Sequence, residues 1–365
     1  MEDARLYHLA LLQVPGVGHA THKTLISYCG SPQAVFSTPV GKLMRIPGIG
    51  EKIARAIHQT SPQAAGQAEL NKVNQLGVQL YTHTDAAYPT RLKHIYDAPA
   101  ILYCKGTLPA DGRTVAIVGT RKATDYGRQV TQRIVQELAP YSPTIVSGLA
   151  YGIDIEAHRA AVQVGLPTVA VMASGIDIIY PPTHRQTAER MVEAGGALIT
   201  EYPIGSKPDA PHFPARNRIV AGLAEAVIVV EAASKGGALI TAHLAQDYNR
   251  EIFAVPGNLN QPQSEGCLQL IQKQIAQIFT SVADLASALN WTGESAPAKP
   301  PLDLSQFSEP AQAILRLLQA TTPGLLLDEL AWKSKIPVHQ VASLLLELEF
   351  QGTIKSLPGK RYRLL

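Results

Sequence analysis

The sequence predicts an α/β protein with a largely parallel sheet, preceded by a helical domain and followed by a winged helix. From about residue 70 to residue 290, short apolar runs rich in β-branched residues alternate with helical segments. Continuous apolar strands that alternate with helices are typical of a parallel sheet covered on both faces. The last 60 residues show the order helix, helix, helix, hairpin, which is that of a winged helix.

The predicted sheet is of the extended Rossmann-like type and occupies residues 69–291. Its strands are expected at 114–119, 144–147, 168–172, 197–200, 226–230 and 252–255. Helices are expected between them, at 126–139, 153–164, 183–194 and 238–248. Ligands of such sheets bind at the carboxyl ends of the strands, so that edge is where we look for a site.

Residues 1–68 predict a helical domain of the helix–hairpin–helix (SAM-like) kind. Two glycine turns nearly repeat, Val14-Pro15-Gly16-Val17-Gly18 and Ile46-Pro47-Gly48-Ile49-Gly50. Such turns can present backbone N–H groups to a phosphate. Few basic residues flank them, so a purely structural role and a DNA contact both remain open.

Residues 292–305 are rich in Pro, Ala, Ser and Gly, and they predict a linker to the winged helix at 306–365. Its third helix, expected over 338–350, carries Glu347 and Glu349 but no Lys or Arg. A helix that reads duplex DNA needs donors for phosphates and base edges, which favours a partner or oligomer contact here. The basic residues of the wing keep duplex binding open: Lys355, Lys360, Arg361 and Arg363.

Composition excludes several classes of protein. The chain has 365 residues, 46% of them hydrophobic and 17% charged, which is typical of a folded protein rather than a disordered one. Its net charge of +3 permits a nucleic-acid partner without requiring one. No signal peptide or apolar stretch of membrane-spanning length is found, so a cytoplasmic location is expected.

The cysteines and histidines predict neither disulfides nor a metal site. The chain has three cysteines, Cys29, Cys104 and Cys267, an odd number that are far apart in the sequence. No Cys or His residues are paired at the spacing typical of zinc ligands. We therefore expect reduced thiols, no metal and no cofactor.

Glycine-rich or polar turns follow three of the predicted strands. These turns are Gly119-Thr120-Arg121-Lys122, Ser147-Gly148 through Gly152, and Ser234-Lys235-Gly236-Gly237. In a parallel sheet they open at one edge, where free N–H groups at helix N-termini favour anions such as phosphate. A fourth segment, with Phe213, Arg216, Asn217 and Arg218, offers a ring for base stacking and two arginines.

Each of these features alone is more often structural, but four that converge at one edge predict a nucleic-acid or nucleotide site. The residues expected to bind DNA are Gly119, Thr120, Arg121, Lys122, Ser147, Gly148, Gly152, Phe213, Arg216, Asn217, Arg218, Ser234, Gly236 and Gly237. No Walker loop, dinucleotide fingerprint, nucleophile elbow or zinc-protease motif is present, so no catalytic residue is assigned. Asp154 is expected to cap a helix and His158 to be packed, while Asp177, His184 and Glu201 have no visible partner.

At these residues the sequence resembles the family of DNA-processing protein A (DprA). The resemblance rests on Val118-Gly119-Thr120-Arg121, the run from Ser147 to His158, Phe213-Pro214-Ala215-Arg216-Asn217-Arg218, Gly236 to Thr241, and Phe253 to Gly257. It is strong over about 80–290 and weaker at both ends. The family's domain plan is a helical domain, an extended Rossmann fold and a winged helix.

The resemblance implies a protein that binds single-stranded DNA, dimerises through the Rossmann-like domain and helps load the RecA recombinase during natural transformation in competent cells. It also implies protection of incoming DNA, and it places the family's phosphate-binding arginine at Arg121. The family's second DNA-contacting lysine has no secure position, Lys207 being the nearest.

We therefore expect a DNA-binding protein that catalyses no reaction. The rival is a nucleotide or nucleoside-phosphate hydrolase on the same fold, but the expected catalytic Glu is missing from the turn at 234–241. A third possibility is a duplex-binding regulator that acts through the winged helix.

Overall fold

The computed structural model describes residues 4–108, 112–291, 304, 307–319, 324–357 and 361–364. The chain divides into two compact units, Met1–Glu294 and Ser295–Leu365. Of the predicted linker 292–305, only Leu304 is among the described residues.

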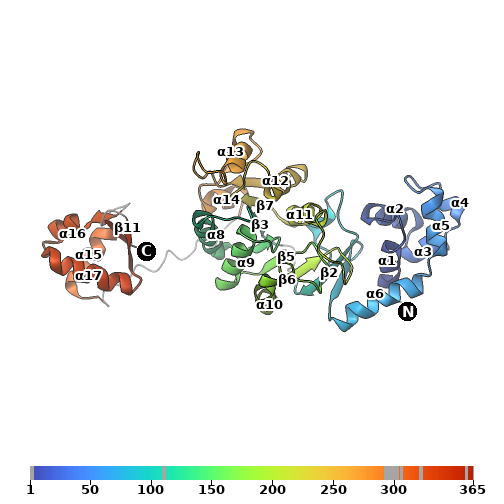
Figure 1. Ribbon diagram of the computed structural model, residues 1–365, viewed down its shortest axis with the longest axis horizontal. Coiled ribbons are helices and arrows are strands. Elements are labelled where there is room, and N and C mark those ends of the chain that lie inside the picture. Colours follow the sequence, from blue (N-terminus) through green and yellow to red (C-terminus); the bar gives the residue numbers. More distant parts are fainter. Residues whose placement is uncertain are drawn as a thin grey trace. The chain divides into compact units, whose positions relative to one another are not determined.

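The first unit begins with a group of helices (Figure 1). These are α1 (Ala4–Leu12), α2 (His19–Cys29), α3 (Pro32–Ser37), α4 (Val40–Leu43), α5 (Glu51–Gln59) and α6 (Pro62–Gln75). Helices α1 to α5 share an apolar core, while α6 packs in a second cluster together with residues of the sheet. The two predicted glycine turns precede α2 and α5, with φ of +87° at Gly16 and +81° at Gly48, where glycine is favoured. Helix α6 runs through residue 68, where the sequence placed the domain boundary, and packs against α1.

A nine-stranded sheet forms the body of the first unit, in the order β1-β2-β6-β5-β4-β3-β7-β8-β9. Its strands are β1 (Gln79–Thr82), β2 (Ile101–Gly106), β3 (Thr114–Val118), β4 (Thr144–Ser147), β5 (Thr168–Val171), β6 (Ala197–Thr200), β7 (Ala226–Val229), β8 (Glu251–Ala254) and β9 (Gln277–Ile278). The six predicted strands are β3 to β8, and they pair in parallel. The sequence missed three strands: β1 and β2, which add an antiparallel edge beside β6, and β9, which pairs in parallel with β8.

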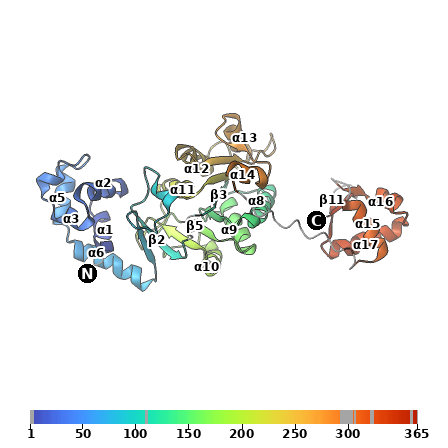
Figure 2. The same ribbon diagram turned by 180° about the vertical axis from the view of Figure 1, so that it is seen from behind.

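Helices cover both faces of this sheet, as Figures 1 and 2 show from opposite sides. One face is covered by α8 (Asp125–Leu138), α9 (Ile153–Gln163), α10 (Arg185–Glu193) and α14 (Val282–Ala288). The other is covered by α7 (Thr90–Lys93), α11 (His212–Leu223), α12 (Gly237–Asp247) and α13 (Glu265–Gln272). Two 3₁₀ turns, Ala139–Tyr141 and Pro182–His184, complete the unit. The α/β architecture predicted from the apolar strands is therefore confirmed.

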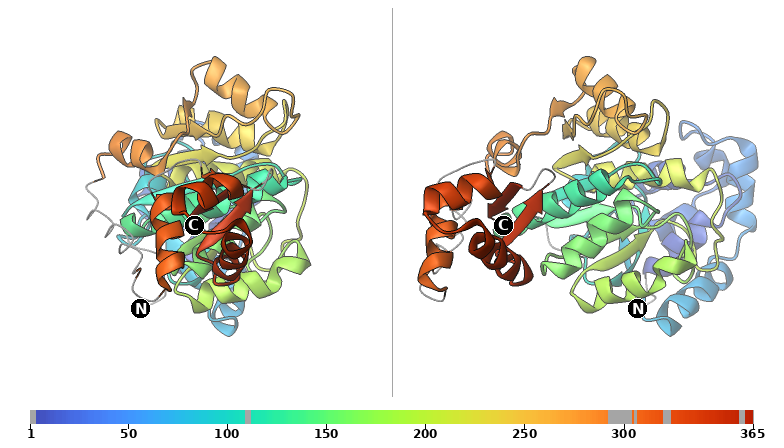
Figure 3. Two further views of the ribbon diagram at one scale, coloured as in Figure 1. Left: turned by 90° about the vertical axis from the view of Figure 1, so that its left-hand side faces the viewer. Right: turned by 60° about the vertical axis from the view of Figure 1, so that its left-hand side comes forward.

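The second unit, red in Figure 3, has the predicted winged-helix order. Its elements are α15 (Glu309–Gln319), β10 (Leu325–Leu326), α16 (Leu327–Ser334), α17 (Val338–Phe350), β11 (Ile354–Leu357) and β12 (Arg361–Leu364). The strands form a small antiparallel sheet in the order β10-β12-β11. Its core includes Ile314, Leu330 and Leu345. Residues 358–360 of the predicted hairpin, among them Lys360, lie outside the described residues.

Candidate functional site

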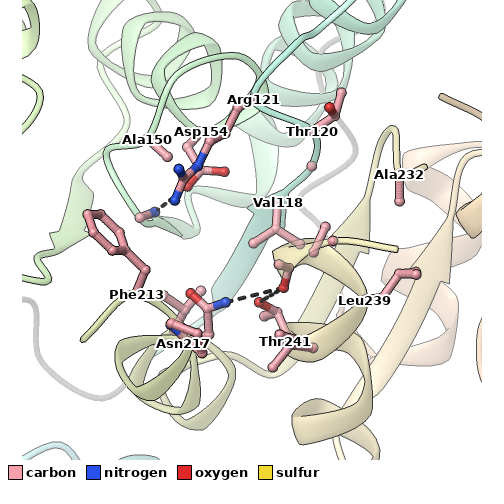
Figure 4. Close-up of a pocket in the computed structure, with 18 of the residues that line it drawn as sticks. Val118, Thr120, Arg121, Ala150, Asp154, Phe213, Asn217, Ala232, Leu239 and Thr241 are labelled. Atoms are coloured by element: carbon pink, nitrogen blue, oxygen red, sulfur yellow. Dashed lines mark hydrogen bonds between the residues drawn. The ribbon is translucent and has the colours of Figure 1, made fainter. Parts of the chain in front are cut away.

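The main pocket lies at the point where the strand order of the sheet reverses. Strand β3 lies between β4 and β7. Helix α8, which follows β3, covers one face of the sheet, and helix α12, which follows β7, covers the other. A crevice at the carboxyl ends of such neighbouring strands is the usual ligand site of a doubly wound sheet. Here it is a cavity of about 740 Å³, lined by the turns after β3, β4 and β7 and by α11 and α12 (Figure 4).

The turn after β3 is held rigidly by backbone contacts. Thr120 N donates to the Glu231 carbonyl at 2.8 Å, and Ile153 N donates to the Thr120 carbonyl at 3.2 Å. A Cβ at Gly119 would lie 2.4 Å from Ile153 Cγ1, so only glycine allows this approach. The Glu231 carboxylate accepts from Thr124 N at 3.0 Å and from the Thr124 hydroxyl. The turn therefore presents its next residue, Arg121, from a fixed position.

Arg121 is exposed and reaches across the opening of the pocket. Its guanidinium carbon lies over the ring of Phe213, 5.0 Å from the ring centroid, in the geometry of a cation–π contact. Figure 4 shows the two side chains approaching each other from α11 and from the turn after β3. The nearest carboxylate along the chain, Asp125, pairs with Arg128 at 2.6 Å and not with Arg121. The donors of Arg121 thus remain available to an anion.

The turn after β4 is built around buried polar contacts. Ser147 is fully buried and its hydroxyl donates to the Ile117 carbonyl at 2.6 Å, so the expectation that it faces a ligand is corrected. Gly152 has φ of +77°, and a Cβ there would lie 2.1 Å from Thr120 O. Gly152 therefore joins the two turns and does not line the pocket. Asp154 caps no helix: its carboxylate accepts from Gly148 N at 3.1 Å.

Arg216 forms the floor of the pocket rather than a mobile contact. Its side chain is buried, and Nη1 donates to the carbonyls of Gly148, at 2.5 Å, and Val171. Burial lowers the pKa of its guanidinium to about 10, so the charge remains at pH 7. Burial raises the pKa of the neighbouring Asp154 carboxyl. Arg216 thus supplies a fixed positive charge beneath the site.

The segment with both arginines lies on helix α11, and this separates their roles. Residues two apart on a helix lie on roughly opposite sides, since each residue advances about 100°. Phe213 and Asn217 line the pocket, and Asn217 Nδ2 donates to the Gly237 carbonyl at 3.2 Å. Arg218 instead pairs with Glu201 at 2.5 Å and lies 3.8 Å from Asp97, so the expectation that it meets DNA is corrected.

The amino terminus of α12 closes the third side of the pocket. Gly236 and Gly237 lie in the lining, where the first N–H groups of the helix have no intrahelical partner. A helix N-terminus attracts anions through these groups and its dipole. Lys235 and His243 also line the pocket, although the sequence did not assign them. Lys235 directly precedes Gly236, which the sequence did assign, so its place in the same glycine-rich turn could have identified it as a site residue.

Nine of the residues expected to bind DNA line this pocket, and five do not. The nine are Gly119, Thr120, Arg121, Gly148, Phe213, Arg216, Asn217, Gly236 and Gly237. Besides Ser147, Gly152 and Arg218, the exposed residues Lys122 and Ser234 are absent from the lining. Among the lining residues, three cations (Arg121, Arg216 and Lys235) face one carboxylate, Asp154. The lining therefore carries an excess of positive charge.

The remaining sequence candidates have structural contacts. His158 is buried and its Nδ1 lies 2.7 Å from the Thr168 hydroxyl, as expected of a packed histidine. Asp177 accepts from Gly205 N at 2.9 Å, and His184 Nδ1 lies 2.8 Å from the Leu149 carbonyl. Glu201, which showed no partner in the sequence, contacts His19 Nε2 at 2.8 Å as well as Arg218.

Comparison with known families decides what this architecture is. The family model described as DNA recombination-mediator protein A matches residues 79–290, more than half of the chain. The chain belongs to the DprA family. A model of the DprA winged-helix domain matches residues 294–360, and a SAM-like helix–hairpin–helix tandem matches residues 9–60.

Individual relatives agree with this assignment to the DprA family. Protein Smf of Synechocystis is 35% identical over 98% of both chains, and DNA processing protein DprA of Bacillus subtilis is 43% identical over 56% of this chain and 69% of its own length. The solved structure of Streptococcus pneumoniae DprA is 33% identical, with a TM-score of 0.67 over 77% of this chain and 97% of that one.

A second solved relative is the Helicobacter pylori protein, whose structure is described as showing a unique single-stranded DNA binding mode. It is 32% identical, with a TM-score of 0.51 over 58% of this chain and 96% of that one. Across the described residues of this DprA protein, no helix has the length and apolar character needed to cross a membrane.

Proposed function

We propose that this DprA protein binds single-stranded DNA across the pocket between β3 and β7 and acts as a recombination mediator that catalyses no reaction. The observation that carries the proposal is the cation–π contact between Arg121 and Phe213 at the opening of the pocket. Buried Arg216 and the N-terminus of α12 line the same pocket. Guanidinium and N–H groups suit phosphates, and an accessible ring suits a base.

Aromatic side chains favour a single strand over a duplex. A smaller cavity of about 90 Å³ adjoins the pocket, and its lining includes Arg121, Phe213, Tyr151 and Tyr180. Tyr151 and Tyr180 are about half exposed, and the Tyr180 ring centroid lies 5.7 Å from that of Phe213. Bases must be unpaired to stack on such rings, and stacking tolerates any sequence. The single-strand binding described for the Helicobacter pylori relative supports this proposal.

Binding without catalysis is favoured because the one carboxylate among the described lining residues, Asp154, is already engaged by the protein. It accepts a hydrogen bond from Gly148 N and lies beside the buried guanidinium of Arg216. A hydrolase needs an acid or base free to meet substrate. Incubation with nucleoside monophosphates, followed by chromatography for free base, separates the two functions. Release of base that is lost in Asp154→Asn would establish the hydrolase instead.

Protection of incoming DNA, loading of RecA and homodimerisation through the Rossmann-like unit complete the proposal. They are supported by membership of a recombination-mediator family. Nuclease digestion of bound strands tests protection, strand exchange on strands coated with single-strand-binding protein tests loading, and light scattering tests the dimer. The roles in competence and transformation and the cytoplasmic location remain predictions.

The central test is fluorescence anisotropy with labelled single strands and blunt duplexes across a range of salt. We expect tighter binding to single strands, with log K falling against log salt at a slope of about −0.7 for each neutralised phosphate. Binding should persist without ATP and in EDTA. Equal or tighter duplex binding would overturn the proposal and favour the winged helix, whose described wing carries Lys355, Arg361 and Arg363.

A further inference from the structure

Three histidines from separate elements meet beside the first edge strand of the sheet. His8 lies on α1, His22 on α2, and His83 directly follows β1. One ring nitrogen of each lies within 4.8 Å of the other two. The rings of His8 and His22 stack at a centroid distance of 5.1 Å, and the His83 ring stands edge-on to them at 6.2 and 5.8 Å. The imidazoles therefore form one compact cluster.

The spacing within this cluster is close to that of a metal site. His8 Nδ1 lies 3.2 Å from His22 Nε2. Two imidazole ligands of a tetrahedral Zn²⁺ ion, each about 2.0–2.1 Å from the metal, stand about 3.3 Å apart. This pair already has that separation, and the third nitrogen needs an approach of about 1.5 Å at most to complete the set.

His83 is oriented to offer its other nitrogen. Its Nδ1 lies 3.4 Å from the carbonyl oxygen of Ala100, which can only accept, so Nδ1 carries the hydrogen. In a neutral ring this leaves a lone pair on Nε2, and a carbonyl behind the opposite N–H is the usual support of a metal-binding histidine. His83 is also half-buried, whereas His8 and His22 are buried, so an ion can enter past it.

The nearby His19 is not a fourth ligand. Its Nδ1 accepts from Ala100 N at 3.1 Å, and its Nε2 contacts Glu201 at 2.8 Å, so both nitrogens are occupied. His22 offers Nε2 to the cluster, 3.2 Å from His8 Nδ1, while its other nitrogen, Nδ1, is buried and has no hydrogen-bond partner among the described residues.

We propose that His8, His22 and His83 bind one divalent transition-metal ion of the Zn²⁺ class, which fastens α1 and α2 to the end of β1. Three imidazoles with one remaining position suit this ion. None of the three histidines lines the pocket between β3 and β7, so the ion supports the structure and takes no part in DNA binding. The ligands are far apart in the chain, which is why the sequence predicted no metal site.

The test is a titration of the full-length protein, first stripped with EDTA and dialysed, with Co²⁺. We expect one saturating equivalent with the visible absorption of tetrahedral Co²⁺, displaced by Zn²⁺, and a higher melting temperature in Zn²⁺. His83→Gln should weaken binding by about 100-fold or more, because one of three ligands is lost. The matched control is His94→Gln, which removes an exposed histidine outside the cluster and should bind like the wild type.

Three outcomes would overturn the proposal. They are a titration without a saturable visible band, equal affinities for the His83→Gln and His94→Gln variants, and fewer than three imidazole ligands in the X-ray absorption spectrum of the Zn²⁺-loaded wild type. The last measurement needs no variant, so it decides the matter even if His83→Gln fails to fold. Single-strand affinity is expected to be the same with and without Zn²⁺, so the metal site and the DNA-binding proposal fail independently.

Discussion

The guanidinium carbon of Arg121 lies 5.0 Å from the centre of the Phe213 ring, which joins the turn after β3 to helix α11 across the mouth of the pocket. The two residues are distant in the chain, and only the fold brings them together. One contributes charge-assisted donors and the other an aromatic face, the two groups that a nucleotide unit requires. Their contact fixes where we expect phosphate and base to lie.

Arg121→Ala should weaken single-strand binding by about tenfold or more while the melting temperature stays unchanged. A charge-assisted hydrogen bond contributes roughly 1.5–3 kcal/mol, and Arg121 has no ion pair among the described residues whose loss would destabilise the fold. Arg121→Lys should restore only part of the affinity, because lysine cannot donate two parallel hydrogen bonds. Anisotropy and thermal melting on one preparation measure both effects.

Lys122→Ala provides the matched control for Arg121. Lys122 is the next residue and is also exposed, but it does not line the pocket. Its removal should change affinity much less than the removal of Arg121. If the two alanine variants lose affinity equally, general charge rather than the pocket holds the strand.

Lys235→Ala should reduce both the affinity and its salt dependence. Lys235 lines the pocket beside the N-terminus of α12, where we expect a phosphate. Loss of one phosphate contact should lower the magnitude of the slope of log K against log salt by about 0.7. Lys273→Ala, an exposed lysine after α13 and outside the pocket, should leave the slope unchanged. A slope unaffected by Lys235→Ala would remove that lysine from the site.

Arg218→Ala should destabilise the fold and leave DNA binding near normal in the folded protein. Arg218 pairs with the buried carboxylate of Glu201, and loss of one partner from a buried pair costs at most about 3–5 kcal/mol, less here because His19 still contacts Glu201. Urea unfolding followed by anisotropy at low temperature measures both quantities. Arg128→Ala, which breaks an exposed pair with Asp125, should cost only about 0–1 kcal/mol. A stable Arg218→Ala protein with weak DNA binding would restore the sequence-based role.

A chain that ends at Glu294 should keep its affinity for single strands within about twofold. The pocket lies within the unit Met1–Glu294. The truncation must retain Trp291, which is buried and whose Nε1 donates to Glu225 at 2.9 Å. Anisotropy with the folded truncated chain measures the effect. A large loss of affinity would show that the winged helix contributes to single-strand binding.

The sequence by itself determined the elements and the edge at which the pocket opens. Buried parallel strands such as β3 and β7 are continuous apolar runs, and glycines follow them where another segment approaches closely, the Ile153 side chain at Gly119 and the Thr120 carbonyl at Gly152. These are local requirements, so they are legible in local sequence. Strands β1 and β2 were missed because they pair antiparallel outside the alternating pattern, and β9 because it has only two residues.

Tertiary structure decided which side chains face the pocket. Arg216 and Arg218 are two residues apart, and only the rotation of α11 sends one to the pocket floor and the other to Glu201. The Ser147 hydroxyl is turned inward to the Ile117 carbonyl, which no property of the Ser-Gly turn indicates. His8, His22 and His83 meet only because α1 and α2 pack beside the end of β1. The direction of a side chain depends on what packs around it, and that packing is set by residues far away in the chain.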